Sequence, residues 1–238
     1  MDAPLTSDQL AALAALSTPT VCNAIETFNV RLRNEGYMDG SIINRTPQLA
    51  PMVGYAVTVR MRTDKPPVKG FTYSDRNDWW DAIVELPHPR IIVIQDMDRI
   101  QGAGSVAGEI HAAIFKALGC VGIVTNGAVR DLDELEAMEM HTYSGGIVPS
   151  HAYAHIIDIG VPVEVGNMMI ENGDLLHGDR HGIVNIPSEI TPDIHVMALK
   201  ILARERTVTN LCASPEFSIE KLRRLVTQQY GDSLEGRN

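Results

Sequence analysis

Two short stretches of the chain combine residue types that can bind a small anion. The first, QGAGSVAGEIHAAIFKALG, places Gly102, Gly104 and Gly108 before or at the start of a predicted helix, with Glu109 in its first turn. Free backbone N–H groups at a helix N-terminus favour a carboxylate or a phosphate. The alternative is a loop that needs glycine only for its backbone geometry. A dinucleotide-binding turn is a weak match to this spacing, and no Gly-Lys-Ser/Thr of a P-loop is present.

The second stretch, GIVTNGAVRDLDEL, sets Arg130 beside Asp131 where an apolar run ends. Taken singly, Asp131 is typical of a helix N-cap, and Glu109 of a first-turn acid that stabilises a helix by under about 1 kcal/mol. Taken together, Glu109, Arg130 and Asp131 follow the carboxyl ends of predicted neighbouring parallel strands, where open α/β sheets place ligands. Two carboxylates and a guanidinium beside a glycine-rich loop indicate a hard divalent cation with an acidic ligand.

The elements that must position these residues follow from hydrophobic spacing and cap signals. Helices are predicted over 6–16, 17–28, 77–86, 105–119 and 131–138, and strands over 54–62, 90–96 and 120–126, the first with one wet face. The alternation of strand and helix predicts right-handed βαβ units and an α/β fold. Short antiparallel or barrel-like strands are predicted over 161–166, 174–179 and 181–187, and helices from 188 onward.

Composition and charge limit the classes of partner. The 238 residues are 45% apolar and 21% charged, with a formal net charge of −10 and three scattered cysteines without CxxC spacing. This charge disfavours nucleic acid and anionic membranes as direct partners, and the cysteine pattern is typical of reduced thiols in an intracellular protein. No basic segment precedes LAALAAL, and no apolar run approaches the roughly 20 residues of a membrane helix. We expect a soluble cytoplasmic protein.

Histidines offer a rival metal site. His151 and His155, four residues apart in HAYAH, would share one face of a helix and could form a zinc pair, but no third ligand follows at a recognisable spacing. A surface or interface role is favoured for both. His177 and His181 flank the GDRHG turn, and we expect them to shape that turn or line a cleft.

The spacing of the acidic residues resembles a known family signature. Glu109, twenty intervening residues and Arg130-Asp131 resemble the acid-X20-Arg-Asp signature of the RraA-like proteins, which include the 4-hydroxy-4-methyl-2-oxoglutarate/4-carboxy-4-hydroxy-2-oxoadipate aldolases. STPTVCNAI, GSVAGE, GCVGIVTNGAVRDLDEL and PVEVGNMMIENGDLLHGDRHGIVNIP are similar to further family segments, in order over roughly 17–190. The family's aldolases usually carry Asp in place of Glu109 and commonly Asp in place of Asn23. The resemblance implies one RraA-like swivelling β/β/α domain over 1–238, with mixed sheets, flanking helices and a helical extension from 188.

The resemblance also implies a chemistry. The chain would be a divalent-metal-dependent lyase that cleaves a C–C bond of a 4-hydroxy-2-oxo dicarboxylic acid to release pyruvate, and that decarboxylates oxaloacetate, through a metal-stabilised enolate. Asp131 would bind Mg²⁺ or Mn²⁺ directly, Glu109 would act through a coordinated water, and Arg130 would contact the keto oxygen. The substrate-binding residues would be Arg130 and the segment of Gly104, Ser105, Val106, Ala107 and Gly108.

The resemblance further implies assembly. Family members form homotrimers or homohexamers with sites at subunit interfaces, and Glu205 is a candidate for an acid that a neighbouring C-terminal helix contributes. Two other functions stay open: a non-catalytic regulator that binds a partner protein, such as a ribonuclease, and a lyase that acts on a sugar-acid derivative.

Overall fold

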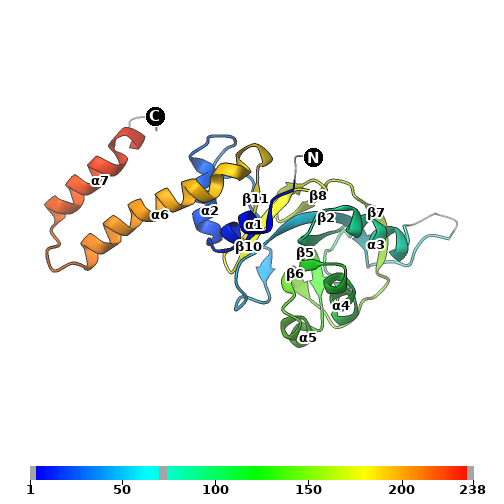
Figure 1. Cartoon of the computed structure of the whole chain (residues 1–238). Coiled ribbons are helices and arrows are strands. Elements are labelled where there is room, and N and C mark those ends of the chain that lie inside the picture. The colour runs from blue at the N-terminus through cyan, green and yellow to red at the C-terminus, as the bar shows by residue number, and fades with distance from the viewer. Residues whose placement is uncertain (1–3, 70–73, 235–238) are drawn as a thin grey trace.

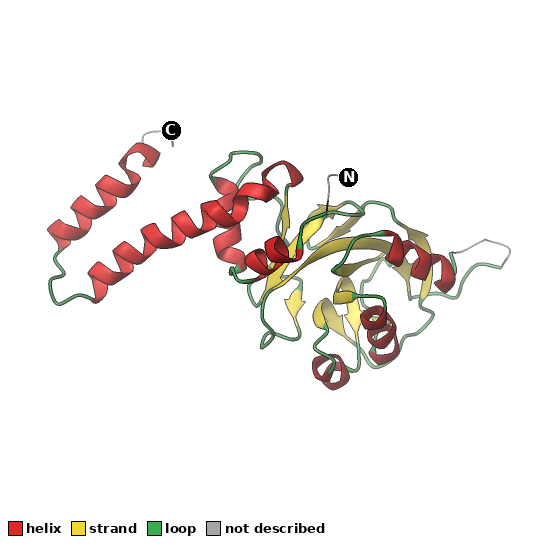
Figure 2. Ribbon diagram, in the orientation of Figure 1, coloured by secondary structure: helices red, strands yellow, loops and turns green. Residues whose placement is uncertain are grey.

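The computed structural model describes residues 4–69 and 74–234, so 235–238, at the end of the predicted helical extension, lie outside the described part. A large mixed sheet forms the centre of the molecule and helices pack around it, while two C-terminal helices extend away from the body (Figures 1 and 2). The strand order is β1-β6-β5-β3-β2-β10-β11, with β4 paired to β5 and β7 paired to β2; β8 and β9 form a separate hairpin.

Four parallel strands make up the part of the sheet that carries the predicted site. They are β2, β3, β5 and β6, which span Met52–Arg62, Arg90–Asp96, Cys120–Val129 and His141–Ile147. The connecting helices are α3, α4 and α5, which span Arg76–Glu85, Glu109–Ala117 and Leu132–Ala137. The predicted alternation of parallel strands and helices is therefore confirmed.

Strand β2 differs from its prediction, because it is buried along nearly its whole length and has no wet face. Val57 and Val59 belong to the core beneath α3 and α4, whereas Ala56 packs with Val165 and Ile170 of the small hairpin. The strand pairs with β3 and β10 along its edges, and apolar layers cover both of its faces. The alternating side chains of β2 therefore point into two different apolar layers.

A short strand replaces the first turn of the helix predicted over 105–119. Strand β4 spans Ser105–Ala107 and pairs in parallel with the end of β5, and α4 begins only at Glu109. The local sequence favours a helix, but pairing with an existing strand satisfies the backbone of these buried residues. This correction places Gly108 at the junction between strand and helix.

The later strands are antiparallel, as predicted. β10 and β11 form a hairpin, and β10 also pairs with β2; the bounds are β7 His155–Ile159, β8 Val163–Val165, β9 Met168–Ile170, β10 Leu175–Asp179 and β11 Gly182–Ile186. The two-residue β1, Ile43–Asn44, pairs antiparallel with β6 at the other edge.

Helices from both ends of the chain cover the sheet beside β10 and β11. α1 and α2 span Ser7–Ala14 and Thr18–Glu26, and the capping box between Thr6 and Gln9 is present. The predicted C-terminal helices are confirmed as a short 3-10 turn, α6 and α7, which span Ser188–Ile190, Thr191–Ala213 and Ile219–Leu234. Over residues 4–69 and 74–234, no helix combines the length and apolar character that crossing a bilayer requires.

Candidate functional site

The structure brings the two chemistry-bearing stretches together at one edge of the sheet. Ala107 of β4 is the register partner of Val129 in β5, and the backbone N–H of Arg130 donates to the carbonyl of Ala107 at 3.1 Å. Glu109 then begins α4, while Arg130 and Asp131 lead into α5. In the fold, these residues therefore lie together past the carboxyl ends of parallel strands, as predicted.

Asp131 occupies the N-cap position of α5, yet its side chain caps a different helix. Its Oδ2 accepts the backbone N–H of Glu109 at 2.9 Å and lies 3.4 Å from Nε of Arg130, while it makes no cap bond to α5. Its backbone has φ 57°, in the left-handed region that Asp and Asn tolerate better than most residues. Such backbone conformations cost free energy and concentrate at functional sites.

Gly108 gives the Asp131 carboxylate its space. A Cβ at this position would lie 2.4 Å from Oδ2 of Asp131 and 2.9 Å from Cγ of Arg130. The backbone of Gly108 is extended, with φ −158°, so glycine is needed here for room and not for conformational freedom. The carboxylate and the guanidinium stem therefore lie directly against the start of α4.

The donor chemistry fits a hard divalent cation. The Asp131 side chain is 33% exposed, and its Oδ1 accepts no hydrogen bond from the described residues, so one carboxylate oxygen faces solvent without a protein partner. Glu109 is exposed at the first position of the helix that Asp131 caps. Within the described residues no three His, Cys, Asp or Glu side chains gather as a metal cage. One or two carboxylates suit Mg²⁺ or Mn²⁺, which keep several waters.

His151 and His155 do not form the zinc pair that a helix would have given them, because residues 151–155 are not helical. His151 lies in a loop with Nδ1 at 2.9 Å from the carbonyl of Ala152, and His155 begins β7 with Nδ1 at 2.7 Å from the carbonyl of Tyr153. The two imidazoles therefore do not share a helical face. His181 does shape its turn, since its backbone N–H and its Nδ1 both bond to Oδ1 of Asp179.

His177 is fully buried in β10. Its Nδ1 lies 3.0 Å from Oγ1 of Thr18 and its Nε2 lies 3.1 Å from the carbonyl of Leu13. Burial lowers the pKa of this imidazole, so it is a neutral link between the sheet and the first two helices.

Part of the glycine-rich segment is already hydrogen-bonded within the chain. The N–H of Gly104 donates to Oγ1 of Thr63 at 2.8 Å, and that of Ser105 donates to the carbonyl of Ser150 at 2.7 Å. These two amides are therefore engaged and offer no free donor to an anion. The assignment of Val106, Ala107 and Gly108 as substrate-binding residues stays a prediction.

Two buried aspartates, which the sequence reasoning did not single out, hold the loop that leads to the site. Oδ2 of Asp98 accepts the N–H and the hydroxyl of Thr63 at 2.8 and 2.7 Å, and Asp96 accepts the N–H of Gly102 at 2.7 Å. Burial raises the pKa of Asp96, whereas the hydrogen bonds to Asp98 outweigh burial and lower its pKa. The signal in the sequence was Asp-x-Asp at the carboxyl end of a buried strand.

A histidine at the start of α4 also went unnoticed. The ring of His111 lies 6.3 Å from that of Trp79 and 5.8 Å from that of Phe115, between centroids. Burial, together with the charges of Arg76, Arg130 and His151, lowers its pKa to about 4. Basic side chains from three other parts of the chain therefore lie near His111.

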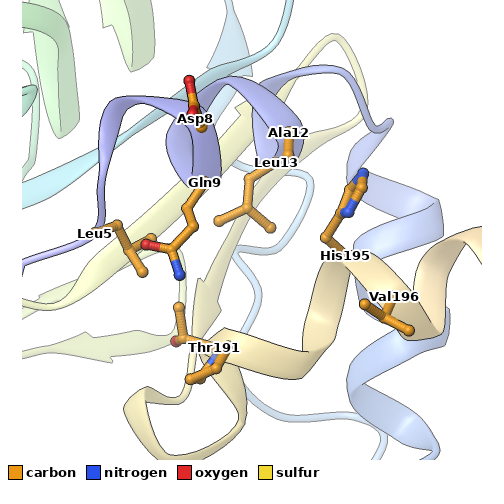
Figure 3. Close-up of a pocket in the computed structure, with 9 residues that line it drawn as sticks. Leu5, Asp8, Gln9, Ala12, Leu13, Thr191, His195 and Val196 are labelled. Atoms are coloured by element: carbon orange, nitrogen blue, oxygen red, sulfur yellow. The ribbon is translucent and has the colours of Figure 1, made fainter.

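A hollow of the surface lies away from this site. It is formed between α1 and the start of α6, where Leu5, Gln9 and Leu13 face Thr191, His195 and Val196 (Figure 3). None of the predicted site residues lines it, and the Gln9 carbonyl oxygen is already engaged by Thr6 in the capping box. The chemistry-bearing residues thus lie outside this hollow.

Comparisons with known proteins place the chain among relatives. The model of the RraA-like family, described as Aldolase/RraA, matches residues 18–185. An uncharacterized protein of Methanocaldococcus jannaschii is 27% identical over 135 residues, and a putative 4-hydroxy-4-methyl-2-oxoglutarate aldolase of Halalkalibacterium halodurans is 28% identical over 123 residues. These matches cover 56% and 50% of this chain, and they span 65% and 59% of the relatives, less than two thirds of either.

A solved structure shares the fold. It is RraAS2 of Streptomyces coelicolor, described as an unusual member of the RNase ES inhibitor RraA protein family, and it superposes with a TM-score of 0.68 at 20% sequence identity. The superposition covers 86% of this chain and 98% of the other. The predicted α/β architecture of this type is therefore confirmed.

Proposed function

Because this chain belongs to the RraA-like family, we propose that it is a divalent-metal-dependent lyase that releases pyruvate from a 4-hydroxy-2-oxo dicarboxylic acid. The same site would decarboxylate oxaloacetate, which also yields pyruvate. The observation that carries the proposal is the meeting of Glu109, Arg130 and Asp131 at the carboxyl ends of β4 and β5, with a solvent-facing carboxylate oxygen at its centre. The similarity to a protein named as a putative aldolase of this substrate class supports it.

Each residue has a role that its surroundings allow. Asp131 would hold Mg²⁺ or Mn²⁺ through its unbonded oxygen, and Glu109 would hold a water beside it. The cation, when bound, supplies a Lewis acid that polarises the oxygens of a 2-oxo acid. Arg130 keeps Nη1 3.5 Å from the carbonyl of Pro149 and Nε 3.4 Å from Asp131, and its Nη2 donates to none of the described residues. Nη2 is therefore available to balance the negative charge that develops on the keto oxygen as the C–C bond breaks.

The experiment measures pyruvate release from oxaloacetate and from 4-hydroxy-4-methyl-2-oxoglutarate, with Mg²⁺ and with EDTA. The decisive variant is Asp131→Asn, because Asn tolerates the left-handed backbone and can still accept the Glu109 N–H, but lacks the charge. Asp133→Asn is the matched control, since it removes one exposed carboxylate from the same helix. Mn²⁺ affinity is measured alongside turnover.

We expect EDTA to abolish turnover, and Asp131→Asn to lose Mn²⁺ binding and turnover while Asp133→Asn keeps both. Turnover in EDTA, or in Asp131→Asn at the level of the control, would contradict the proposal. No turnover of either substrate by the natural chain would also contradict it. Sugar-acid derivatives would then be tested first, and a partner protein, as for a regulator, after them.

Assembly is part of the proposal. Leu199, Leu202 and Phe217 are large apolar side chains exposed on the two-helix extension, and no described residue of α7 is buried. We expect a second copy of the chain to cover this extension in a homotrimer or homohexamer. Glu205, the candidate for an acid contributed to a neighbouring site, lies on the same helix α6. Light scattering on the purified protein measures the mass, and a monomer would contradict this part.

A further inference from the structure

Basic side chains from four elements lie near the N-terminal end of α4. Arg76 begins α3, His111 lies in the first turn of α4, Arg130 follows β5, and His151 lies in the loop after β6. Arg76, Arg130 and His151 all lie close enough to His111 for their charges to act on its imidazole. The chain as a whole carries 30 acidic against 20 basic residues, so such a gathering runs against its overall charge.

Packing between α3 and α4 fixes one side of this cluster. Trp79 is 1% exposed, and its ring lies 5.0 Å from Phe115 and 6.3 Å from His111. Arg76 precedes Trp79 by three residues, a spacing that places both on one face of a helix. The exposed guanidinium of Arg76 is thus carried on the side of α3 that faces His111.

The loop 148–154 fixes the other side. Nη1 of Arg130 lies 3.5 Å from the carbonyl of Pro149, and a Cβ on Gly104 would lie 2.8 Å from the carbonyl of His151. The segment that leads into β4 and α4 therefore runs directly against the backbone of His151. Arg130 connects this loop to Asp131, so the cluster and the proposed cation site share the Arg130 side chain.

Several donors of the cluster have no acceptor. Arg76 forms no ion pair with any residue in 4–69 or 74–234, and the ring nitrogens of His111 make no hydrogen bond there. The indole Nε1 of Trp79 is buried and equally without a partner among those residues. Buried polar groups are rarely left unpaired unless a water or a ligand completes them. A carboxylate, which accepts only, is the ligand that this set lacks.

Resting on the proposed function, we propose that Arg76, His111 and His151 form a subsite for the second carboxylate of the substrate. Arg130 then separates the reacting end of the 2-oxo acid, at Asp131, from its distal end, at the cluster. The subsite makes the enzyme select 2-oxo dicarboxylic acids over monocarboxylic ones. Arg76 and His151, which are exposed, supply the adaptable contacts, and His111, packed on Trp79 and Phe115, supplies the fixed one.

The first test measures binding without metal or turnover. Glutarate and butyrate, which carry two carboxylates and one carboxylate on a three-carbon chain, are titrated in EDTA at low salt. Calorimetry and the fluorescence of Trp79 and Trp80 report binding. The variants are Arg76→Gln and His151→Gln, and Arg223→Gln on α7 is the matched control that removes one exposed cation elsewhere. We expect the natural chain to bind glutarate more tightly than butyrate. The affinity for glutarate should fall about tenfold in Arg76→Gln and stay unchanged in the control variant.

The second test measures specificity in turnover. With Mg²⁺, Arg76→Gln and His151→Gln should raise KM for 4-hydroxy-4-methyl-2-oxoglutarate and leave kcat near that of the natural chain. Both constants for 4-hydroxy-2-oxopentanoate, which lacks the second carboxylate, should stay unchanged. A merely structural role would affect both substrates alike.

The outcomes separate the subsite from the proposed function. Equal glutarate affinity in the natural chain and in both variants overturns the subsite, even if metal-dependent turnover is present. So does a natural chain that binds butyrate as well as glutarate. Glutarate binding that depends on Arg76, in a chain without turnover, supports the anion subsite and overturns the lyase.

Discussion

Gly108→Ala tests whether contact with the start of α4 positions the Asp131 carboxylate. The added Cβ would lie 2.4 Å from Oδ2 of Asp131, whereas ordinary contact begins at 3.4 Å, so the oxygen must retreat by about 1 Å. The backbone of Gly108 is extended and accepts alanine without strain, so the perturbation acts on the neighbouring side chains alone.

The expected magnitude differs between folding and function. A retreat of 1 Å breaks the 2.9 Å bond from the Glu109 N–H, and the loss of one such half-exposed bond costs about 1–2 kcal/mol of folding free energy. Displacing a positioned group by the same distance costs roughly 100-fold in rate. Gly108→Ala should therefore fold with a slightly reduced stability and lose most of its Mn²⁺ affinity and turnover.

The assay compares urea unfolding, Mn²⁺ binding and pyruvate release in Gly108→Ala and Gly40→Ala. Gly40 is the control because a Cβ there meets no atom within 4 Å. We expect Gly40→Ala to match the natural chain in function. Retention of full Mn²⁺ affinity by Gly108→Ala would refute the reasoning, since Asp131 would then not depend on its place against α4.

Three further predictions concern the scaffold. Arg90 is 4% exposed and donates to the carbonyls of Val84, Leu86 and Leu118 at the ends of α3 and α4, so Arg90→Met should lower the free energy of unfolding by about 3 kcal/mol in urea titrations. The pKa of His177 is lower in the folded protein than in the unfolded chain, so, as the pH falls, this imidazole is protonated first in the unfolded chain. The stability that His177 contributes is therefore complete above about pH 6.5 and falls as the pH drops below that value. His177→Asn should flatten this slope, and an unchanged slope would exclude His177 as its source. Thr63→Val removes the hydroxyl between Asp98 and Gly104, and should speed hydrogen exchange of the Gly104 amide at least tenfold without changing the amides of β5.

The sequence predicted the site's neighbourhood because its signals are local and repeated. The strands at 90–96 and 120–126 are short apolar runs, and parallel strands joined by helices end at the same edge, so Arg130 and Asp131 had to meet residues from the preceding crossover. What could not be read was Ser105–Ala107. Gly104 and Gly108 flank these residues, and only pairing with the end of β5, more than twenty residues later, makes them a strand.

Long-range packing also explains the other differences. The strand at 54–62 shows alternation, but neither side faces water, because the small hairpin of β8 and β9 and the terminal helices cover the side that would otherwise be wet. The role of Asp131 as a cap for α4 has no local signature, since its partner is the N–H of Glu109 on another helix. Likewise, His111 acquires its surroundings from α3 and from the loop after β6.

The position of β2 has a consequence for how the chain reaches this structure. The strand pairs with β3, which follows soon after it, but also with β7 and with β10, where Tyr55 meets Leu175. During synthesis the part of this edge that β10 pairs, from Met52 to Tyr55, therefore stays open until the hairpin of β10 and β11 leaves the ribosome. Such distant pairings slow folding, and an open apolar edge invites association with other chains. Nascent chains that stop short of Leu175 should thus be the species that depend on chaperones.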